Sequence, residues 1–145
     1  MTPIEASDVL ARFPEPSPTL DSKPYWDATR AGVLRIQVCT SCTRGIFPAR
    51  PVICPFCNGT LEWREPSRRC ALYSWIGVDT VIHDWQQEAV PYVVAMVSLS
   101  DFPDAKIPCF YGGTRDVLQA GVKGEIVFAD VGKDYGVPVF APSSQ

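Results

Sequence analysis

Two pairs of cysteines constrain this chain more than any other feature. Cys39 and Cys42 form one Cys-x-x-Cys pair, Cys54 and Cys57 form another, and eleven residues separate the pairs. Two residues between cysteines let the backbone turn while both sulfurs reach one ion, and four thiolates suit tetrahedral Zn²⁺. The pattern predicts a zinc ribbon; iron or an oxidised form of the cysteines is the alternative. Four protein ligands leave no position open for a substrate, so we expect structural zinc.

The segment between the cysteine pairs is richer in apolar residues than a metal loop requires. Its apolar side chains either pack on the rest of the fold or form a contact face, and they are Ile46, Phe47, Ile53 and Phe56. Gly45 and Gly59 follow the two pairs, where we expect turns that need positive φ.

The charge is unevenly distributed along the 145 residues, which are enough for one ordinary domain or two very small ones. The net charge of −3 and the pI of about 5.1 argue against a general polyanion binder. Residues 30–69, however, contain seven Arg, no Lys and two acids, giving +5, so the remainder carries −8. A basic segment on an acidic body suggests a local anionic ligand or an acidic partner surface; solvated arginines are the plain alternative.

No apolar stretch approaches the roughly 20 residues that a membrane-spanning helix needs. The N-terminus MTPIEASDVLARF lacks the basic start and apolar run of a signal peptide. We therefore expect a cytoplasmic protein, in which paired cysteines favour metal over disulfides.

The N-terminal third predicts short helices around a linker. We expect a helix over 2–13, an extended proline-rich linker over 14–24, and a second helix over 24–31, capped by Asp21 or Ser22 and ended by Gly32. The second helix carries the aromatic pair Tyr25 and Trp26, which either folds onto the core or anchors a partner.

The rest of the chain has a β pattern. Strands over 34–38 and 61–65 enter and leave the cysteine segment, and five more strands follow at 68–83, 91–100, 106–113, 124–131 and 135–142. Gly77 is placed to supply a bulge or a bend in the first of the five, and Pro108 puts the third near an edge. We expect a mainly β protein with N-terminal short helices, a rubredoxin-like zinc ribbon and a five-stranded OB-fold barrel. The expected divisions are 1–32, 33–65 and 66–145.

No catalytic constellation is evident in the sequence. His83 is the single histidine and Cys109 a conceivable nucleophile, but nothing places them together, and Cys70 and Cys109 fall in strand-like segments. There is no phosphate-binding glycine loop and no nucleophile elbow. We expect the chain not to be catalytic by itself.

Single-stranded nucleic acid is a common ligand of OB-folds, which bind it through stacking aromatics and a basic groove. The aromatics are present as Tyr73, Trp75, Trp85, Tyr92, Phe110 and Tyr111, yet residues 70–145 contain only four Lys or Arg. Nucleic-acid binding is therefore a weak alternative.

Several segments together resemble one known family. They are YWDATRAGVLRIQVCTSC at 25–42, FPARPVICPFC at 47–57, PYVVAMVSL at 91–99, and GVKGEIVFAD followed by VPVFAP between 121 and 142. The chain resembles the zinc-ribbon plus OB-fold proteins long called domain of unknown function 35, over roughly residues 25–142.

The resemblance implies an accessory subunit that binds and stabilises a thiolase-like catalytic partner, such as a thiolase, an acyltransferase or a retro-aldolase acting on acyl-CoA thioesters. It implies structural Zn²⁺ and a hetero-oligomer, with the catalytic residues supplied by the partner. From the lack of a long apolar stretch we expect no membrane partner. CoA carries phosphates, and arginine binds phosphate through bidentate hydrogen bonds. The candidate CoA- or partner-binding residues are Arg44, Phe47, Arg50, Arg68, Arg69, Tyr25 and Trp26. A stand-alone acyl-CoA carrier or sensor is the alternative.

Overall fold

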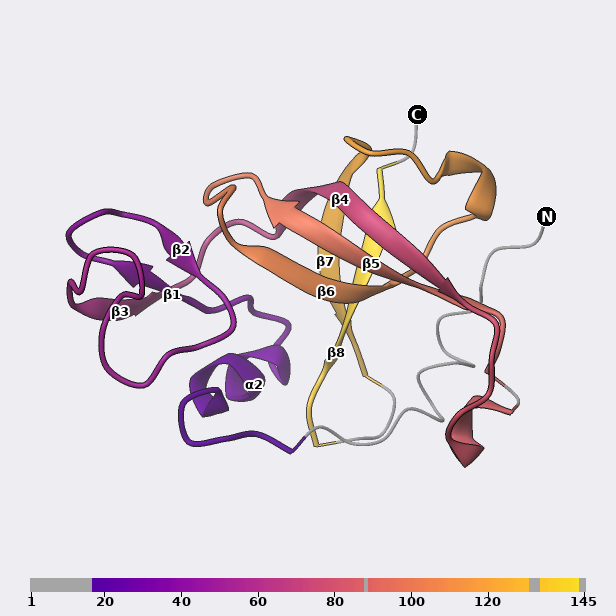
Figure 1. Cartoon of the computed structure of the whole chain (residues 1–145), viewed down its shortest axis with the longest axis horizontal. Helices are drawn as coiled ribbons and strands as arrows, with labels where there is room; N and C mark the ends of the chain where they lie inside the picture. The colour runs from indigo at the N-terminus through magenta and orange to yellow at the C-terminus, as the bar shows by residue number, and fades with distance from the viewer. Residues whose placement is uncertain (1–16, 88, 131–133, 144–145) are drawn as a thin grey trace.

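The computed structural model describes residues 17–87, 89–130 and 134–143. The helix expected over 2–13 lies outside the described residues. The described part contains one α-helix, α2 (Lys23–Thr29), a small ribbon sheet and a closed barrel (Figure 1). Figure 1 places the ribbon at one end of the long axis of the molecule, with α2 beneath the junction between ribbon and barrel.

The ribbon is a three-stranded antiparallel sheet in the order β2-β1-β3. Its strands are β1 (Ile36–Cys39), β2 (Gly45–Ile46) and β3 (Leu61–Arg64). The two longer strands overlap the ranges predicted for them, 34–38 and 61–65. The two-residue strand β2 was not predicted, because so short a segment carries no periodicity.

The barrel closes in the order β4-β5-β6-β8-β7. Its strands are β4 (Arg69–Val78), β5 (Tyr92–Leu99), β6 (Lys106–Tyr111), β7 (Lys123–Ala129) and β8 (Val137–Pro142). Only the pair β6–β8 is parallel, as in a five-stranded Greek-key barrel. The expected fold class, mainly β with a rubredoxin-like ribbon and a five-stranded barrel, is confirmed. Two 3₁₀ turns lie in the connections between barrel strands: η1 (Asp84–Gln86) between β4 and β5, and η2 (Arg115–Val117) between β6 and β7.

The first barrel strand differs from its prediction in length and in the site of its bulge. β4 ends at Val78, so residues 79–83 belong to a loop. The register with β5 shifts between Leu72 and Ser74, which makes Tyr73 the extra residue, whereas Gly77 pairs regularly with Val93. The predicted bulge at Gly77 is therefore wrong. Pro108 lies opposite Met96 of β5, in the part of β6 that does not pair with β8.

One hydrophobic core extends from the ribbon into the barrel. Leu34, Ile36 and Val38 are each 1% exposed and share a cluster with barrel residues such as Ile107 and Phe140. A second cluster covers part of the outer barrel face and includes Tyr92, Phe110 and Val139. The ribbon is thus attached to the barrel by buried apolar side chains, although the division at 65/66 stays a prediction.

The helix α2 begins after Ser22, one of the two predicted caps, with Pro24 in its first turn. The Ser22 hydroxyl makes no capping bond to the helix and instead accepts a hydrogen bond from the Thr19 N–H at 2.9 Å. After the last turn, Gly32 has φ +73° and the Val33 N–H donates to the Ala28 carbonyl at 3.0 Å. The predicted glycine stop is in place.

Among the described residues, no helix is long and apolar enough to cross a membrane. The cytoplasmic location expected from the sequence stays a prediction.

The close approach of β7 and β8 gives a test of the barrel. A Cβ atom at Gly124 would lie 2.3 Å from the Ala141 carbonyl oxygen. Backbone atoms cannot yield easily there, so Gly124→Ala should lower the free energy of unfolding by about 1–3 kcal/mol. Urea unfolding monitored by tryptophan fluorescence measures the loss. Gly77→Ala is the control, because its nearest neighbour would lie at 3.9 Å; equal stability of the two variants would contradict the packing.

Candidate metal centre and surrounding surfaces

The four predicted ligands meet at the end of the ribbon. The sulfurs of Cys39, Cys42, Cys54 and Cys57 all lie within 4.8 Å of one another. The Cys39 and Cys57 sulfurs are 3.4 Å apart, and those of Cys42 and Cys54 are 3.7 Å apart. Zn–S bonds of about 2.3 Å in a tetrahedron place sulfurs roughly 3.8 Å apart. The four cysteines therefore fit a structural Zn²⁺ with a closed coordination shell.

Backbone amides support the sulfurs of both knuckles. The N–H groups of Ser41 and Cys42 donate to the Cys39 sulfur at 3.4 Å, and the Phe56 N–H donates to the Cys54 sulfur at 3.4 Å. The amide of Cys42, followed by that of Ser41, lowers the pKa of the Cys39 thiol. The turn after Cys39 thus favours the thiolate form of that one ligand.

The turn residues of the knuckles differ from those predicted. Thr43 and Asn58 take the positive φ values, +64° and +63°, whereas Gly45 and Gly59 do not. Thr43 N–H donates to the Cys39 carbonyl and Asn58 N–H to the Cys54 carbonyl, both at 3.0 Å. The turn closes one residue after each cysteine pair, so the glycines come too late to supply it.

The two glycines are needed for space. A Cβ at Gly45 would lie 2.7 Å from Cβ of Phe102, and one at Gly59 would lie 2.9 Å from the Cys39 sulfur. Gly45 lets the ribbon approach the loop between β5 and β6, and Gly59 lets the chain pass beside the metal ligands.

The apolar side chains between the cysteine pairs divide between the two alternatives left open by the sequence. Ile46 is buried and Phe47 packs against the core that joins ribbon and barrel. Ile53 and Phe56 are 48% and 59% exposed. Val52, which sequence reasoning did not single out, is 72% exposed and adds to this surface. We call Val52, Ile53 and Phe56 the ribbon tip.

The loop that leads to the ribbon tip is held by a buried glutamine. Gln37 on β1 is 6% exposed; its Nε2 donates to the Arg50 carbonyl at 2.8 Å and its Oε1 accepts from the Arg50 N–H at 2.7 Å. The Gln37 side chain thus pairs with the Arg50 backbone as a neighbouring strand would. The backbone of Arg50 is held in place, whereas its side chain is exposed.

The four candidate arginines lie in different surroundings. The Arg44 guanidinium is 4.4 Å from the ring centre of Phe56 and 3.8 Å from a carboxylate oxygen of Asp104. Arg68 is half-buried and donates to the Ile126 carbonyl at 3.2 Å. Arg50 and Arg69 are exposed, and no ion pair is found for either among the described residues. Two of the four are therefore engaged within the fold.

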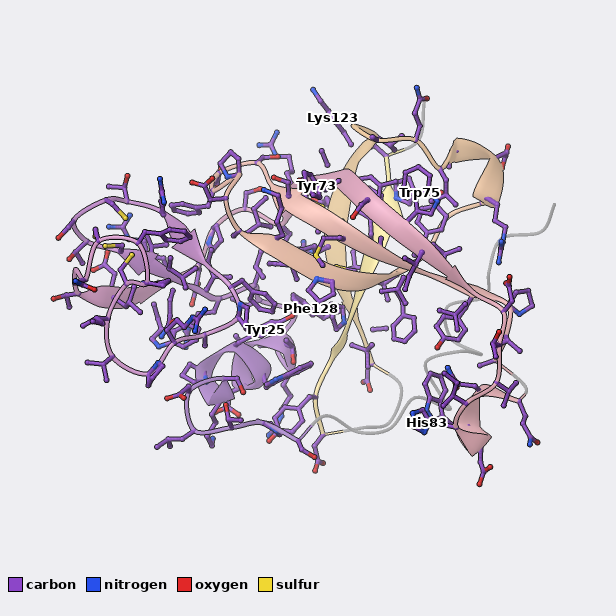
Figure 2. All side chains as sticks on the ribbon, viewed as in Figure 1. Tyr25, Tyr73, Trp75, His83, Lys123 and Phe128 are labelled. Carbon is purple, nitrogen blue, oxygen red and sulfur yellow. The ribbon has the colours of Figure 1, made fainter. Side chains whose placement is uncertain are left out.

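The two residues of the aromatic pair of α2 lie in different surroundings. Tyr25 is 4% exposed and its ring meets those of Phe47 and Phe128 edge-on, at centroid distances of 5.2 and 6.4 Å. Figure 2 shows Tyr25 and Phe128 close together beside α2. Trp26 is only half-buried.

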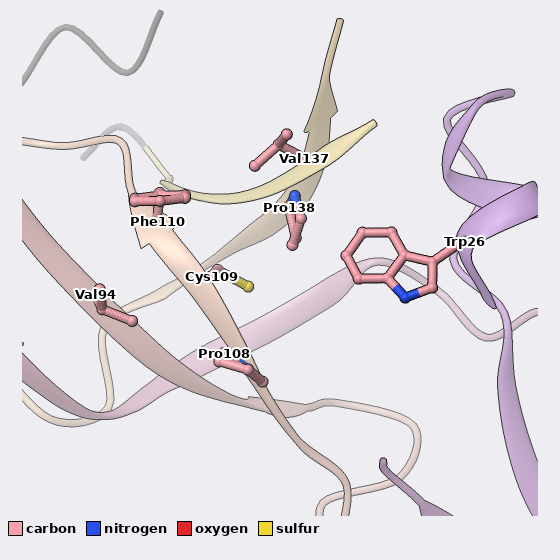
Figure 3. Close-up of a pocket in the computed structure, with 7 residues that line it drawn as sticks. All are labelled: Trp26, Val94, Pro108, Cys109, Phe110, Val137 and Pro138. Atoms are coloured by element: carbon pink, nitrogen blue, oxygen red, sulfur yellow. The ribbon is translucent and has the colours of Figure 1, made fainter. Parts of the chain in front are cut away.

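Trp26 lines two apolar cavities. One has a volume of about 210 Å³ on the outer barrel face (Figure 3), where the indole faces Val94, Pro108, Cys109, Phe110, Val137 and Pro138. The other, of about 200 Å³, lies on the ribbon side and includes Tyr25, Ile36 and Phe47. The indole stands between them.

His83 and Cys109 belong to different parts of the molecule. His83 is exposed in the loop after β4 (Figure 2), and its backbone carbonyl accepts a hydrogen bond from the Gln86 N–H at 2.9 Å. Cys109 is 3% exposed, and burial, followed by the charge of Cys70, raises the pKa of its thiol. A thiol of raised pKa in an apolar core is a poor nucleophile.

The fold and the metal centre define the class: a zinc-ribbon protein with a five-stranded barrel. The family model described as "ChsH2, rubredoxin-like zinc ribbon domain" matches residues 26–64. Residues 26–64 are therefore similar in sequence to rubredoxin-like zinc ribbons of the ChsH2 type.

Two solved structures extend the likeness to the barrel. A chain of "Ltp2-ChsH2(DUF35) aldolase" is 24% identical with a TM-score of 0.75, over 89% of this chain and 99% of that chain. A DUF35-family protein of unknown function from Sulfolobus solfataricus is 16% identical with a TM-score of 0.61, over 86% of each chain. A search of curated proteins found no match. The resemblance to the DUF35 family is confirmed for the ribbon and for the fold.

The metal centre yields a direct prediction. The purified chain should contain about one Zn per molecule, and Cys54→Ser should lose most of it and unfold the ribbon. Elemental analysis and the near-ultraviolet circular dichroism of the ribbon aromatics measure both effects. Cys109→Ala, in the barrel, should keep full zinc content. Retention of zinc by Cys54→Ser would contradict the assignment.

Proposed function

We propose that this chain is a non-catalytic accessory subunit of a thiolase-like enzyme complex acting on acyl-CoA thioesters. The observation that carries the proposal is the shared ribbon and barrel, which span almost all of a chain in a structure whose description joins ChsH2(DUF35) to Ltp2 in an aldolase. The catalytic groups would come from the partner, and this chain would stabilise it.

The reactive groups of the described residues support a non-catalytic role. The thiols of the ribbon form a four-ligand set that leaves no position for a substrate. Burial raises the pKa of the barrel thiols, that of Cys70 to about 12. His83 lies in an exposed loop.

The ribbon tip is the first surface we assign to the partner. Val52, Ile53 and Phe56 are exposed, yet the metal and the Gln37–Arg50 hydrogen bonds hold their backbone in place. An apolar surface that is already ordered loses little entropy on binding. Arg44, stacked on Phe56, adds a cation at its rim.

The CoA phosphates, where they reach this chain, would meet Arg50 and Arg69 more readily than Arg44 and Arg68. The first two have exposed side chains without an ion pair among the described residues, whereas Arg44 bridges to Asp104 and Arg68 donates to Ile126. Phosphate binding at Arg44 would first require the Asp104 contact to open.

Copurification tests the proposed function. Co-expressed with a thiolase-like chain encoded by a neighbouring gene, the wild-type protein should form a stable hetero-oligomer. Phe56→Ala should weaken it about tenfold or more, because an exposed aromatic anchor is removed. Leu20→Ala, at an 88% exposed residue before α2, is the control. A chain that stays monomeric and neither binds nor activates such a partner would refute the proposal.

A stand-alone acyl-CoA carrier is the second candidate, and the cavity beside Trp26 is the observation that favours it. Its lining is apolar and it opens on the outer barrel face, as an acyl group would need. The isolated chain should then bind an acyl-CoA ester, and the Arg50→Ala/Arg69→Ala double variant should lose that binding. Arg35→Ala, which removes a ribbon charge paired with Glu65, is the control. Titration calorimetry of the isolated chain, without a partner, separates the two candidates.

Nucleic-acid binding gains little support from the barrel. Of the six aromatics proposed for base stacking, Tyr92, Phe110 and Tyr111 are 9% exposed or less. Bases could reach Tyr73 and Trp75, but the strongly basic groove that such binding requires is not supplied by this acidic chain.

A further inference from the structure

The connection between β4 and β5 presents an apolar tip at the end of the molecule opposite the ribbon (Figure 1). We call residues 79–87, DTVIHDWQQ, the β4–β5 hook. Ile82 is 78% exposed and Val81 is 42% exposed, so two adjacent branched aliphatic side chains face solvent. This tip was not predicted, because residues 79–83 continue the apolar pattern of the preceding strand.

The hook is an ordered loop. Gln86, in the 3₁₀ turn η1, is 6% exposed, and its Oε1 accepts hydrogen bonds from the N–H groups of Ile82 and His83, both at 2.8 Å. Its Nε2 donates to the Tyr92 hydroxyl at 3.1 Å. One buried amide thus satisfies the backbone on either side of the exposed isoleucine and ties it to β5.

The base of the hook is equally well packed. The ring of Trp85 lies 5.8 Å from that of Tyr92, which in turn lies 5.8 Å from Phe110 on β6. These three aromatics belong to or pack against the outer cluster of the barrel. Ile82 does not join this aromatic cluster. The hydrogen bond from its N–H to Gln86 holds its backbone in place, and its side chain stays in solvent.

The charge of the hook is negative. Asp79 and Asp84 flank the two aliphatic residues, and the hook contains no Lys or Arg. Arg115 of η2 lies at its base, with its Nη1 3.9 Å from the position that a Cβ of Gly77 would take. An apolar tip between two carboxylates fits an apolar socket with a basic rim, and it would be repelled by CoA phosphates or by anionic lipid head groups.

We propose that the β4–β5 hook is a second docking element, which inserts Ile82 into an apolar socket with a basic rim on the thiolase-like catalytic subunit. The inference rests on the proposed function and adds to it a surface far from the zinc ribbon. Preorganisation by Gln86 lowers the entropic cost of docking, and the aspartates orient the approach.

The experiment uses the full chain and the thiolase-like chain encoded by a neighbouring gene. Ile82→Glu should raise the dissociation constant at least about tenfold, because a charge replaces the anchor. Leu20→Glu, an equally exposed apolar residue outside the hook, is the matched control and should bind as the wild type. Asp79→Asn/Asp84→Asn should slow association and reduce its dependence on salt.

A photo-crosslinking amino acid at position 82 identifies the occupant. A crosslink to the thiolase-like chain, at a peptide containing apolar residues beside Lys or Arg, is the expected result. A crosslink to a second copy, for instance to its ribbon tip, would overturn the proposal in favour of self-association. If the wild type binds the partner and Ile82→Glu binds equally well, the hook assignment fails while the proposed function stands. If the wild type does not bind, both fail.

Discussion

Three aliphatic side chains of the ribbon, Leu34, Ile36 and Val38, enter the same core as the barrel strands. A three-stranded ribbon with one two-residue strand buries too little surface to be stable alone, so it depends on the metal at one end and on this apolar joint at the other. The joint also places α2, since Tyr25 packs on Phe47 of the ribbon and Phe128 of the barrel. The metal centre, the ribbon, α2 and the barrel are therefore joined by one continuous set of packing contacts.

The metal centre could be predicted from the sequence because its determinants are local. Two Cys-x-x-Cys pairs specify the ligands without knowledge of the tertiary fold, and the alternation of apolar residues over 34–38 located β1. The turns were harder: Gly45 and Gly59 were expected to supply positive φ, but Thr43 and Asn58 do so. A glycine needed for conformation and one needed for space look alike in sequence, and only the positions of Phe102 and the Cys39 sulfur distinguish them.

The surfaces could be predicted only in part, because exposure depends on contacts between distant segments. Ile46, Phe47, Ile53 and Phe56 looked equivalent, yet Ile46 is buried beside the cysteines of the ribbon and Phe47 packs on the core shared with the barrel. The other two are exposed. The hook was missed since residues 68–83 have the composition of one long strand, whereas the chain leaves the sheet at Val78. The signal that could have found it is Gln86, a polar residue between Trp85 and Tyr92, whose amide holds the loop.

Both ends of the molecule are fixed by the same device. Gln37 and Gln86 are each 6% exposed, and each uses its side-chain amide to bind backbone groups of a loop as a neighbouring strand would. The ribbon tip and the β4–β5 hook are therefore attached to a rigid body and cannot move independently without breaking these bonds. The fold therefore sets the distance between the ribbon tip and the β4–β5 hook. A binding surface could contact both ends of one copy only if its two apolar sockets had the same separation.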